Sequence, residues 1–368
     1  MIKTNTILQG DALKVLKTFP DESVDCIITS PPYWGLRDYG IKGQIGLEKT
    51  PEEYVAKLVK IFGHLNRVLK KQGTLWLNLG DSYASAWACS RRSIIGQAAP
   101  NLQQRQKRIP RGSGRWGGGN NSVQGLKEKD LIGIPWRVAF ALQADGWYLR
   151  QDIIWSKPNP MPESVTDRCT KSHEYIFLLT KSKKYYYDSE AVKEPLAPAS
   201  IARLSQDLEN QKGSERVPGK TNGNMKAVRG KGSIRPHSAE RVPSGWHQSK
   251  TGRGRHPAYG ISGTGFAGHS ENVLADGKNY SKRNKRSVWT ITTKPYKEAH
   301  FATFPEALIE TPIKAGCPKG GIVLDPFFGS GTTGLVAQNL GRLWLGIEIN
   351  PKYIKIAQDR LRQQPMIK

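Results

Sequence analysis

A glycine-rich turn between two apolar strands near the end of the chain is the feature that most constrains the fold. Residues 321–325, GIVLD, read as a buried strand, PFFGSGTTG as a tight turn, LVAQNL as a helix, and LWLGIE as a second strand that ends at Glu348. Gly329, Gly331 and Gly334 match the pattern G-x-G-x-x-G, and Glu348 stands nineteen residues after the first of them. Strand, turn, helix and strand in this order predict an α/β fold with a parallel sheet.

The composition of this turn indicates a cofactor that contains a nucleoside. Glycines let the backbone approach a ligand closely, and a carboxylate at a strand end can accept both ribose hydroxyls of an adenosine. NAD and S-adenosylmethionine both contain this group. A dinucleotide site normally opens its chain and has a second mononucleotide half, whereas here only one helix follows. Asp325, ahead of the glycines, would repel a pyrophosphate and suits a sulfonium, which favours S-adenosylmethionine.

The first eighty residues also alternate between strands and helices. The predicted strands are residues 7–11, 24–29 and 73–81, and the predicted helices are residues 12–19 and 51–72. The second helix has Thr50 as its N-cap and ends before Gly73. After residue 130 the chain resumes with a helix and a strand, and residues 174–188 read as one arm of a hairpin. The alternation of strands and helices up to residue 81 follows βαβ order and implies a parallel sheet.

The strand VDCIIT stops abruptly at TSPPYW, residues 29–34. Pro31 and Pro32 lack amide donors and hold φ at about −65°, so the chain leaves the sheet in a stiff, extended shape. Tyr33 and Trp34 follow at once. Two rings on a rigid loop at a strand end either cap the core or form a stacking platform for a planar ligand, and these residues alone fit both interpretations.

The charge of the chain predicts a polyanionic partner. Its 56 Lys and Arg residues against 31 Asp and Glu residues give a net charge of +25. Residues 85–130 carry nine basic and two acidic side chains, and residues 189–286 carry eighteen and eight. Both segments are rich in Gly, Ser and Arg, which is typical of loops rather than of a packed core. Because a basic surface lowers the cost of approaching phosphates, nucleic acid is the favoured partner.

Composition also excludes several classes of protein. No stretch approaches the roughly 18 to 20 apolar residues of a membrane span, and the start MIKTNTILQG lacks the apolar segment of a secretory signal, so we expect a cytoplasmic protein. The four cysteines include no C-x-x-C pair, which argues against a zinc site or a disulfide scaffold. No metal is expected.

TSPPYW at 29–34 together with DPFFGSGTTG at 325–334 resembles the amino-methyltransferases of DNA in the β group, where the catalytic motif comes first, the target-recognition region next and the cofactor motif last. Four further blocks are similar to blocks of that family: residues 7–13, 73–83, 153–188 and 299–310. The resemblance implies a Rossmann-like, doubly wound and mostly parallel α/β sheet, circularly permuted, with basic irregular insertions.

The resemblance also implies an organisation into parts. Residues 1–84 and 131–188 would form the catalytic half of one methyltransferase domain, and residues 287–368 its cofactor-binding half. Residues 85–130 would be a basic Gly-rich insertion, and residues 189–286 the target-recognition region.

The resemblance assigns catalysis to Ser30, Pro31, Pro32 and Tyr33. The Ser30 hydroxyl and the Pro31 carbonyl would accept hydrogen bonds from the amino group that receives the methyl, and Tyr33 would stack on a base flipped out of the duplex. The prolines would fix the carbonyl in place. The chain has no Pro-Cys dipeptide such as carbon-5 cytosine methylases use, so no cysteine is a candidate nucleophile.

For the cofactor S-adenosylmethionine, the resemblance places Glu348 on the ribose hydroxyls, Asp11 near the adenine amino group and Phe327 against the adenine. The methionine end would lie along the turn, whose residues are Asp325, Gly329, Ser330, Gly331 and Thr332. His300, Phe301 and Pro305 would lie beside the cofactor. From the residues alone, Asp11 fits a helix cap equally well, and His300 fits a packed or capping histidine.

Serine at position 30 favours one target over another. Family members with S-P-P-Y usually methylate cytosine N4, and those with D-P-P-Y adenine N6, so cytosine is favoured and adenine is the alternative. Double-stranded DNA would be the partner, with a cognate restriction endonuclease as a possible second one; oligomeric state is left open. A non-catalytic DNA-binding homologue, an RNA methyltransferase and an NAD-dependent oxidoreductase fit the motifs and the charge less well.

Overall fold

The computed structural model describes residues 2–36, 38–84, 126–127, 129–198, 200, 282–293 and 304–362. Backbone contacts divide the chain into two units, Met1–Val192 with Lys285–Lys368, and Lys193–Asn284. In the described part of the second unit, β6 (Glu194–Pro195) pairs antiparallel with β7 (Lys282–Arg283). All other elements named below belong to the first unit. Most of the predicted segments 85–130 and 189–286 lie outside the described residues.

The first unit is built on one eight-stranded sheet. In spatial order its strands are β1 (Thr6–Gln9), β10 (Leu343–Glu348), β9 (Ile322–Asp325), β2 (Val24–Thr29), β3 (Leu69–Leu79), β5 (His173–Thr180), β4 (Tyr148–Ser156) and β8 (Val288–Thr290). β5 runs antiparallel to both of its neighbours, and every other adjacent pair is parallel. The predicted α/β fold with a mostly parallel sheet is confirmed.

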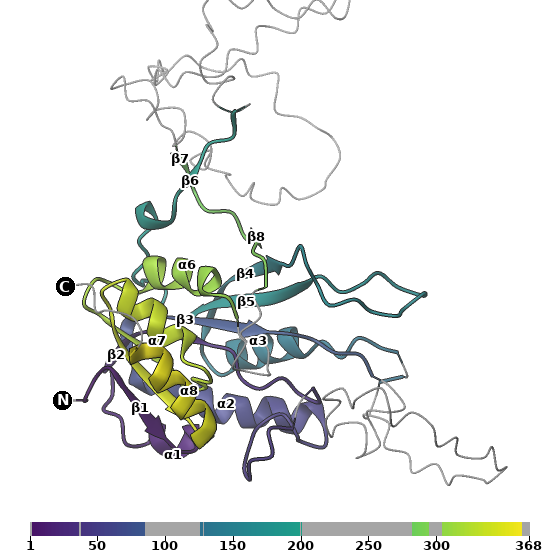
Figure 1. Ribbon diagram of the computed structural model, residues 1–368, viewed down its shortest axis with the longest axis horizontal. Helices are drawn as coiled ribbons and strands as arrows, with labels where there is room; N and C mark the ends of the chain where they lie inside the picture. The colour runs from purple at the N-terminus through teal and green to yellow at the C-terminus, as the bar shows by residue number, and fades with distance from the viewer. Residues whose placement is uncertain are drawn as a thin grey trace, which may run out of the picture. The chain divides into compact units, whose positions relative to one another are not determined.

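Helices cover both faces of this sheet (Figure 1). On one face lie α1 (Ala12–Leu16), α2 (Pro51–Val68) and α3 (Ile134–Ala144). On the other lie α6 (Glu306–Gly316), α7 (Thr332–Asn339), α8 (Pro351–Arg362) and the short 3-10 helix η2 (Glu190–Val192). Each face therefore has its own apolar core, as the predicted doubly wound arrangement requires.

Helix α2 begins as predicted and ends earlier than predicted. The Thr50 side chain accepts a hydrogen bond from the backbone N–H of Glu53 at 3.1 Å, which caps the first turn. The helix stops at Val68 instead of running to Gly73, because Leu69 already has extended backbone angles and pairs with Val24 of β2. Helix α1 likewise ends at Leu16 rather than at residue 19.

The two motifs singled out in the sequence meet at the centre of the sheet. β2 pairs with β9 in parallel, so their carboxyl ends lie at the same edge. TSPPYW leaves that edge from β2, and the glycine turn leaves it from β9. From this point the chain builds the sheet outward in both directions, through β3 on one side and β10 on the other. Such a topological switch point is where open α/β sheets bind their ligands.

We predict that Gly346→Ala destabilises the fold. A Cβ at Gly346 in β10 would lie 2.4 Å from the Phe328 ring, which stacks on Trp344, so the ring must shift in a packed core. Overpacking of this kind lowers the free energy of unfolding by about 1–3 kcal/mol. Gly63→Ala is the matched control, because that glycine is exposed on α2 and its Cβ would meet its nearest neighbour at 3.9 Å.

The control should raise the free energy of unfolding by roughly 0.5–1 kcal/mol, since alanine favours helix. Urea denaturation of both variants measures the difference. If Gly346→Ala were as stable as the parent, the packing of Phe328 described here would be wrong.

Candidate active site

Residues packed against the loop after β2 hold it rigidly. Pro31 is buried, and the Pro32 carbonyl accepts a hydrogen bond of 2.9 Å from the Tyr54 hydroxyl on α2. Gly46 lies directly against the loop, where a Cβ would be 2.9 Å from the Tyr33 carbonyl oxygen, and its φ of +99° is one that glycine adopts readily. The Pro31 carbonyl accepts no hydrogen bond from any residue that the structure describes. Its acceptor capacity is therefore unused by the described part of the chain.

The two rings of the loop have different environments. Trp34 belongs to the core and donates its indole N–H to the Glu48 carbonyl at 3.0 Å. Tyr33 is only partly buried, and its ring lies against Gly80, where a Cβ would come within 2.5 Å of the ring. Of the two interpretations of these rings, capping of the core therefore applies to Trp34. The stacking role of Tyr33 stays a prediction.

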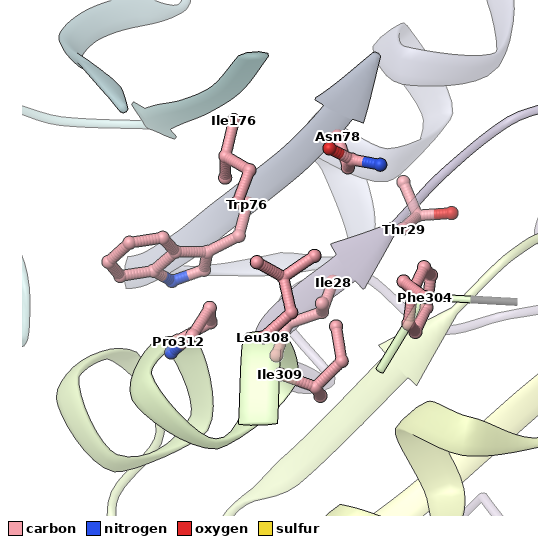
Figure 2. A pocket seen from close by; sticks show the side chains of 9 residues that line it. All are labelled: Ile28, Thr29, Trp76, Asn78, Ile176, Phe304, Leu308, Ile309 and Pro312. Atoms are coloured by element: carbon pink, nitrogen blue, oxygen red, sulfur yellow. The ribbon is translucent and has the colours of Figure 1, made fainter. Parts of the chain in front are cut away.

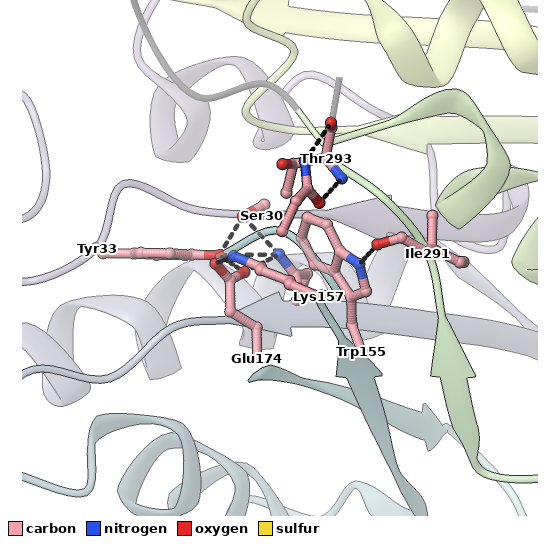
Figure 3. Close-up of polar contacts among 9 residues, drawn as sticks. Ser30, Tyr33, Trp155, Lys157, Glu174, Ile291 and Thr293 are labelled. Carbon is pink, nitrogen blue, oxygen red and sulfur yellow. Dashed lines mark hydrogen bonds and ion pairs between the residues drawn. The ribbon is translucent and has the colours of Figure 1, made fainter. Parts of the chain in front are cut away.

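Five polar side chains gather at this loop, and we call them the Ser30 cluster: Ser30, Tyr33, Asn78, Lys157 and Glu174 (Figure 3). The Tyr33 hydroxyl donates to the Glu174 carboxylate at 2.7 Å, and the Ser30 hydroxyl donates to the Tyr33 oxygen at 3.3 Å. The Asn78 amide nitrogen lies 2.8 Å from the Tyr33 oxygen and 3.0 Å from Glu174. Lys157 forms an ion pair with Glu174.

The environment keeps the Tyr33 hydroxyl protonated. Burial, and next the negative charge of Glu174, raise the pKa of Tyr33 well above its ordinary value. The side chain is therefore a neutral hydroxyl, able both to donate and to accept hydrogen bonds.

A small apolar pocket lies beside the Ser30 cluster, between the sheet and α6 (Figure 2). Its lining residues are Ile28, Thr29, Trp76, Asn78, Ile176, Phe304, Leu308, Ile309 and Pro312. The buried Asn78 amide oxygen has no hydrogen-bond partner among the described residues. A buried acceptor without a partner is costly, so a donor outside the described residues is needed to satisfy it.

On the other side of the β2–β9 junction, Glu348 closes the glycine turn. Its carboxylate accepts the backbone N–H of Gly329 and that of Asn350, each at 2.7 Å. Burial raises the pKa of this carboxyl, whose residue is 8% exposed. The Gly10 N–H donates to the Glu348 carbonyl at 2.9 Å, so Asp11 is brought to the same edge. Asp11 also caps α1, accepting from the backbone N–H of Lys14 at 3.1 Å.

Asp325 joins the two motifs from within the core. It is 1% exposed, and its carboxyl accepts hydrogen bonds from the Thr29 hydroxyl at 2.8 Å, the Thr333 hydroxyl at 2.7 Å and the Phe327 N–H at 3.0 Å. The Thr29 bond links the residue before Ser30 directly to the start of the glycine turn. Burial raises the pKa of Asp325 to about 6 despite these bonds.

The glycines of the turn have unequal roles. Gly329 has φ +53° and open space around the position of a Cβ, as expected where a ligand approaches. A Cβ at Gly334 would instead lie 2.6 Å from the Phe328 ring, so this glycine makes room for a core side chain. Gly331, with φ +80°, is the N-cap of α7. Backbone φ thus accounts for glycine at positions 329 and 331, and the Phe328 ring accounts for it at position 334.

The remaining predicted site residues are placed as follows. Phe327 is partly buried at the turn, while Ser330 and Thr332 are buried, and the Thr332 hydroxyl accepts from Arg360 at 2.8 Å. Pro305 is the N-cap of α6. His300 and Phe301 lie outside the described residues. The structure thus brings the Ser30 loop, Phe327, Gly329, Glu348 and Asp11 to one edge of the sheet.

Three members of the Ser30 cluster were not predicted: Asn78, Lys157 and Glu174. Asn78 lies in β3 and Glu174 at the start of β5, two strands that pair antiparallel with Leu79 opposite Tyr175. The signal in the sequence is weak, a single amide within an apolar strand and an acid at a strand start. Both residues lie within the family-like blocks 73–83 and 153–188, but no role was assigned to either, and the pairing of β3 with β5 brings them to Ser30.

Known proteins resemble this chain along almost its whole length. A family model described as DNA methylase matches residues 24–359. The Type II methyltransferase M.XycI of Xanthomonas campestris pv. cyanopsidis is 41% identical over 364 residues, covering 99% of this chain and 90% of that protein. The Type II methyltransferase M.Cfr9I of Citrobacter freundii is 43% identical over 357 residues, covering 97% and 87%.

A solved structure shares the fold. The PvuII DNA methyltransferase, described as cytosine-N4-specific, matches with a TM-score of 0.55 over 100% of this chain and 89% of that one. Its sequence is 16% identical, so this similarity bears on the fold alone. In the described part of the chain, no helix is both long and apolar enough to cross a membrane.

We predict a pH-dependent stability difference between the protein and Asp325→Asn. The pKa of about 6 in the folded protein lies above the value of about 3.9 for an exposed Asp. The carboxyl's contribution to stability is therefore complete below about pH 4 and lost as the pH rises through about 6. Relative to the variant, the protein should lose about 2–3 kcal/mol of unfolding free energy between about pH 4 and 7.

Urea denaturation at a series of pH values measures this difference. Asp21→Asn, at an exposed carboxylate, is the control and should show a much flatter profile. A difference between protein and Asp325→Asn that does not change with pH would contradict the burial of an ionisable group at this junction.

Proposed function

The chain belongs to the DNA methylase family, the site-specific amino-methyltransferases of DNA, and we propose that it methylates the N4 amino group of a cytosine flipped out of double-stranded DNA. The observation that carries the proposal is the Thr29–Asp325 hydrogen bond of 2.8 Å, which ties the Ser30 loop to the cofactor turn. A methyl donor in that turn and an acceptor group at Ser30 would then face the same space.

The arrangement of the site suits the main chemical difficulty of this reaction, which is the low nucleophilicity of the amino group. The lone pair of an exocyclic amino group is delocalised into the ring, so the nitrogen is a poor nucleophile until acceptors hold its hydrogens and aim it at the methyl group. The Ser30 hydroxyl and the Pro31 carbonyl would be two such acceptors, in a loop that is held by the Tyr54 hydrogen bond to Pro32 and by the close packing of Gly46. Tyr33 would stack on the flipped base.

S-adenosylmethionine is the cofactor of this family and supplies an electrophilic methyl group on a sulfonium. The residues of the turn fit it. Each Glu348 oxygen accepts one backbone N–H, which leaves a second lone pair on each for a ribose hydroxyl. Gly329 has space for close approach, and Phe327 offers a ring beside it. Asp11, at the end of β1, would accept from the adenine amino group.

Adenine N6 is the second candidate target. Serine in place of aspartate at position 30 supports cytosine, and it is the only residue that favours one base. The acceptors at Ser30 and Pro31 would serve either amino group, so the mechanism is the same for both.

We further propose how the rest of the chain serves this reaction. The basic segment 189–286 would be the target-recognition region and residues 85–130 a second DNA-contacting insertion, because both concentrate positive charge. Residues 1–84 with 131–188 and residues 287–368 would be the catalytic and cofactor-binding halves of one domain. A cognate restriction endonuclease would recognise the same site, and the cytoplasm, where a bacterial chromosome lies, would be the compartment.

We predict that Ser30→Ala lowers methyl transfer by about two or more orders of magnitude and leaves cofactor affinity unchanged. The reason is that the hydroxyl contacts the amino group and not the cofactor. Incubation with methyl-labelled S-adenosylmethionine and mixed genomic DNA, followed by nucleoside digestion and mass spectrometry, measures the transfer and identifies the product. Calorimetry measures the affinity.

Ser23→Ala, whose hydroxyl donates to Pro20 at the opposite end of β2, is the matched control and should behave as the parent. N4-methylcytosine as the product supports the proposed target, and N6-methyladenine would replace it with the second candidate. Loss of cofactor affinity in Ser30→Ala would contradict the role given to Ser30.

We also predict that affinity for DNA falls about 100-fold or more between about 50 and 200 mM salt, since lysines and arginines would displace counterions from many phosphates. Fluorescence anisotropy with labelled duplex fragments measures it, and the affinity for S-adenosylmethionine should change far less over the same range. A DNA affinity that is flat with salt would remove the case for the basic segments as DNA contacts.

A further inference from the structure

Each hydrogen bond of the Ser30 cluster has a fixed donor and a fixed acceptor, and the series of bonds begins at Glu174. The Tyr33 hydroxyl lies 2.7 Å from a Glu174 oxygen and has its proton, so it must donate to the carboxylate. The reverse orientation would place two bare oxygens in contact. Hydrogen bonds to a charged acceptor are also about twice as strong as neutral ones. The Tyr33 proton is therefore committed to Glu174, and the Tyr33 oxygen can only accept from its other neighbours.

Asn78 reinforces this direction. Its amide group must turn the NH₂ end toward Glu174, at 3.0 Å, because the oxygen end would meet a negative charge. The two amide protons go to the nearest acceptors, Glu174 and the Tyr33 oxygen at 2.8 Å. Ser30, at 3.4 Å from the same nitrogen, receives the weakest of the three contacts.

Ser30 stands at the end of this chain of bonds. Its hydroxyl proton is directed to the Tyr33 oxygen, which is turned to accept it. Among the described residues, its lone pairs receive only the long contact from Asn78. The hydroxyl consequently presents acceptor capacity, rather than a proton, to whatever enters the site.

Lys157 stabilises the Glu174 carboxylate, at which this series of hydrogen bonds begins. The side chains of the pair are 18% and 15% exposed, so the lysine compensates a largely desolvated carboxylate. Lys157 also lies over the Trp155 ring, 4.3 Å from its centre, and the Trp155 indole N–H donates to the Ile291 carbonyl at 2.8 Å. Two residues further on, Asn159 forms two hydrogen bonds with the backbone of Thr293, at 3.2 and 3.0 Å. Figure 3 shows this frame around the cluster.

We propose that Glu174 is a positioning residue, which acts through Tyr33 to turn Ser30 into an obligate hydrogen-bond acceptor and so selects a base that presents an amino group. Thymine O4 or guanine O6 in the same place would meet lone pairs instead of a donor. This inference rests on the proposed function, since it concerns the substrate of that site.

The competing interpretation is that Glu174 and Lys157 form an ion pair that only stabilises the β4–β5 hairpin. If the ion pair were purely structural, its loss would change thermal stability and the binding of both substrates. Its effect on the rate would then add independently to the effect of removing the Tyr33 hydroxyl. A directional series of hydrogen bonds instead affects the rate of the transfer step itself. Breaking that series at two places should slow transfer little more than breaking it at one.

The experiment compares Glu174→Gln, Tyr33→Phe and the double variant with the parent. Glu174→Gln keeps the size of the side chain and removes its charge, and Tyr33→Phe keeps the ring and removes the hydroxyl. Glu22→Gln, which removes an exposed ion pair with Lys181 at the opposite edge of the sheet, is the matched control. The readouts are the single-turnover rate of methyl transfer to genomic DNA and the half-saturating concentrations of S-adenosylmethionine and DNA.

We expect each single variant to slow transfer by about 10- to 100-fold at saturation. Half-saturating concentrations should stay within about twofold, and the double variant within about twofold of the slower single one. A rate for Glu174→Gln within about twofold of the parent, or losses that multiply in the double variant, would overturn the inference alone. A parent protein that binds S-adenosylmethionine but transfers no methyl to DNA would overturn the proposed function and the inference together.

Discussion

The pairing of β2 with β9 at the centre of the sheet is the constraint on which the rest of the site depends. These strands are about three hundred residues apart in the chain, yet Cys26 lies opposite Val323 and Ile27 opposite Leu324. The Thr29–Asp325 hydrogen bond completes the junction at the carboxyl ends. Because both strands are parallel and central, the loops that follow them must open on the same crevice. A proline-stiffened loop and a glycine turn that lie far apart in the sequence are thus brought to one edge of the sheet.

Carboxylates at this edge of the sheet each organise a different group. Asp325 is buried within the junction and receives two threonine hydroxyls and a backbone N–H. Glu348 orders the turn through two backbone N–H groups. Glu174 alone has a cationic partner, Lys157, and alone is bound to a tyrosine hydroxyl. The first two therefore order the glycine turn and its junction with β2, and the third orders the Ser30 loop.

Local patterns in the sequence predicted the fold and the two motif loops well, because proline stiffness, glycine φ and apolar periodicity act over a few residues. These patterns failed where tertiary contacts determine an element's end or a residue's neighbours. Helix α2 was predicted to end before Gly73 but ends at Val68, because β3 pairs with β2 from Leu69 onward. Gly334 serves the Phe328 ring, which no spacing rule indicates. Glu174 reaches Tyr33 across 141 residues because β5 pairs antiparallel with β3, and the predicted hairpin arm at 174–188 did not indicate that pairing.

The most direct test of this account is a crystal structure of the protein with S-adenosylhomocysteine. The account predicts that the ribose hydroxyls contact the Glu348 carboxylate, the adenine packs on Phe327, and the sulfur faces the crevice beside Ser30. An adenosyl group bound away from the β9 turn, or a sulfur directed away from Ser30, would contradict the claim that the β2–β9 junction brings methyl donor and acceptor together.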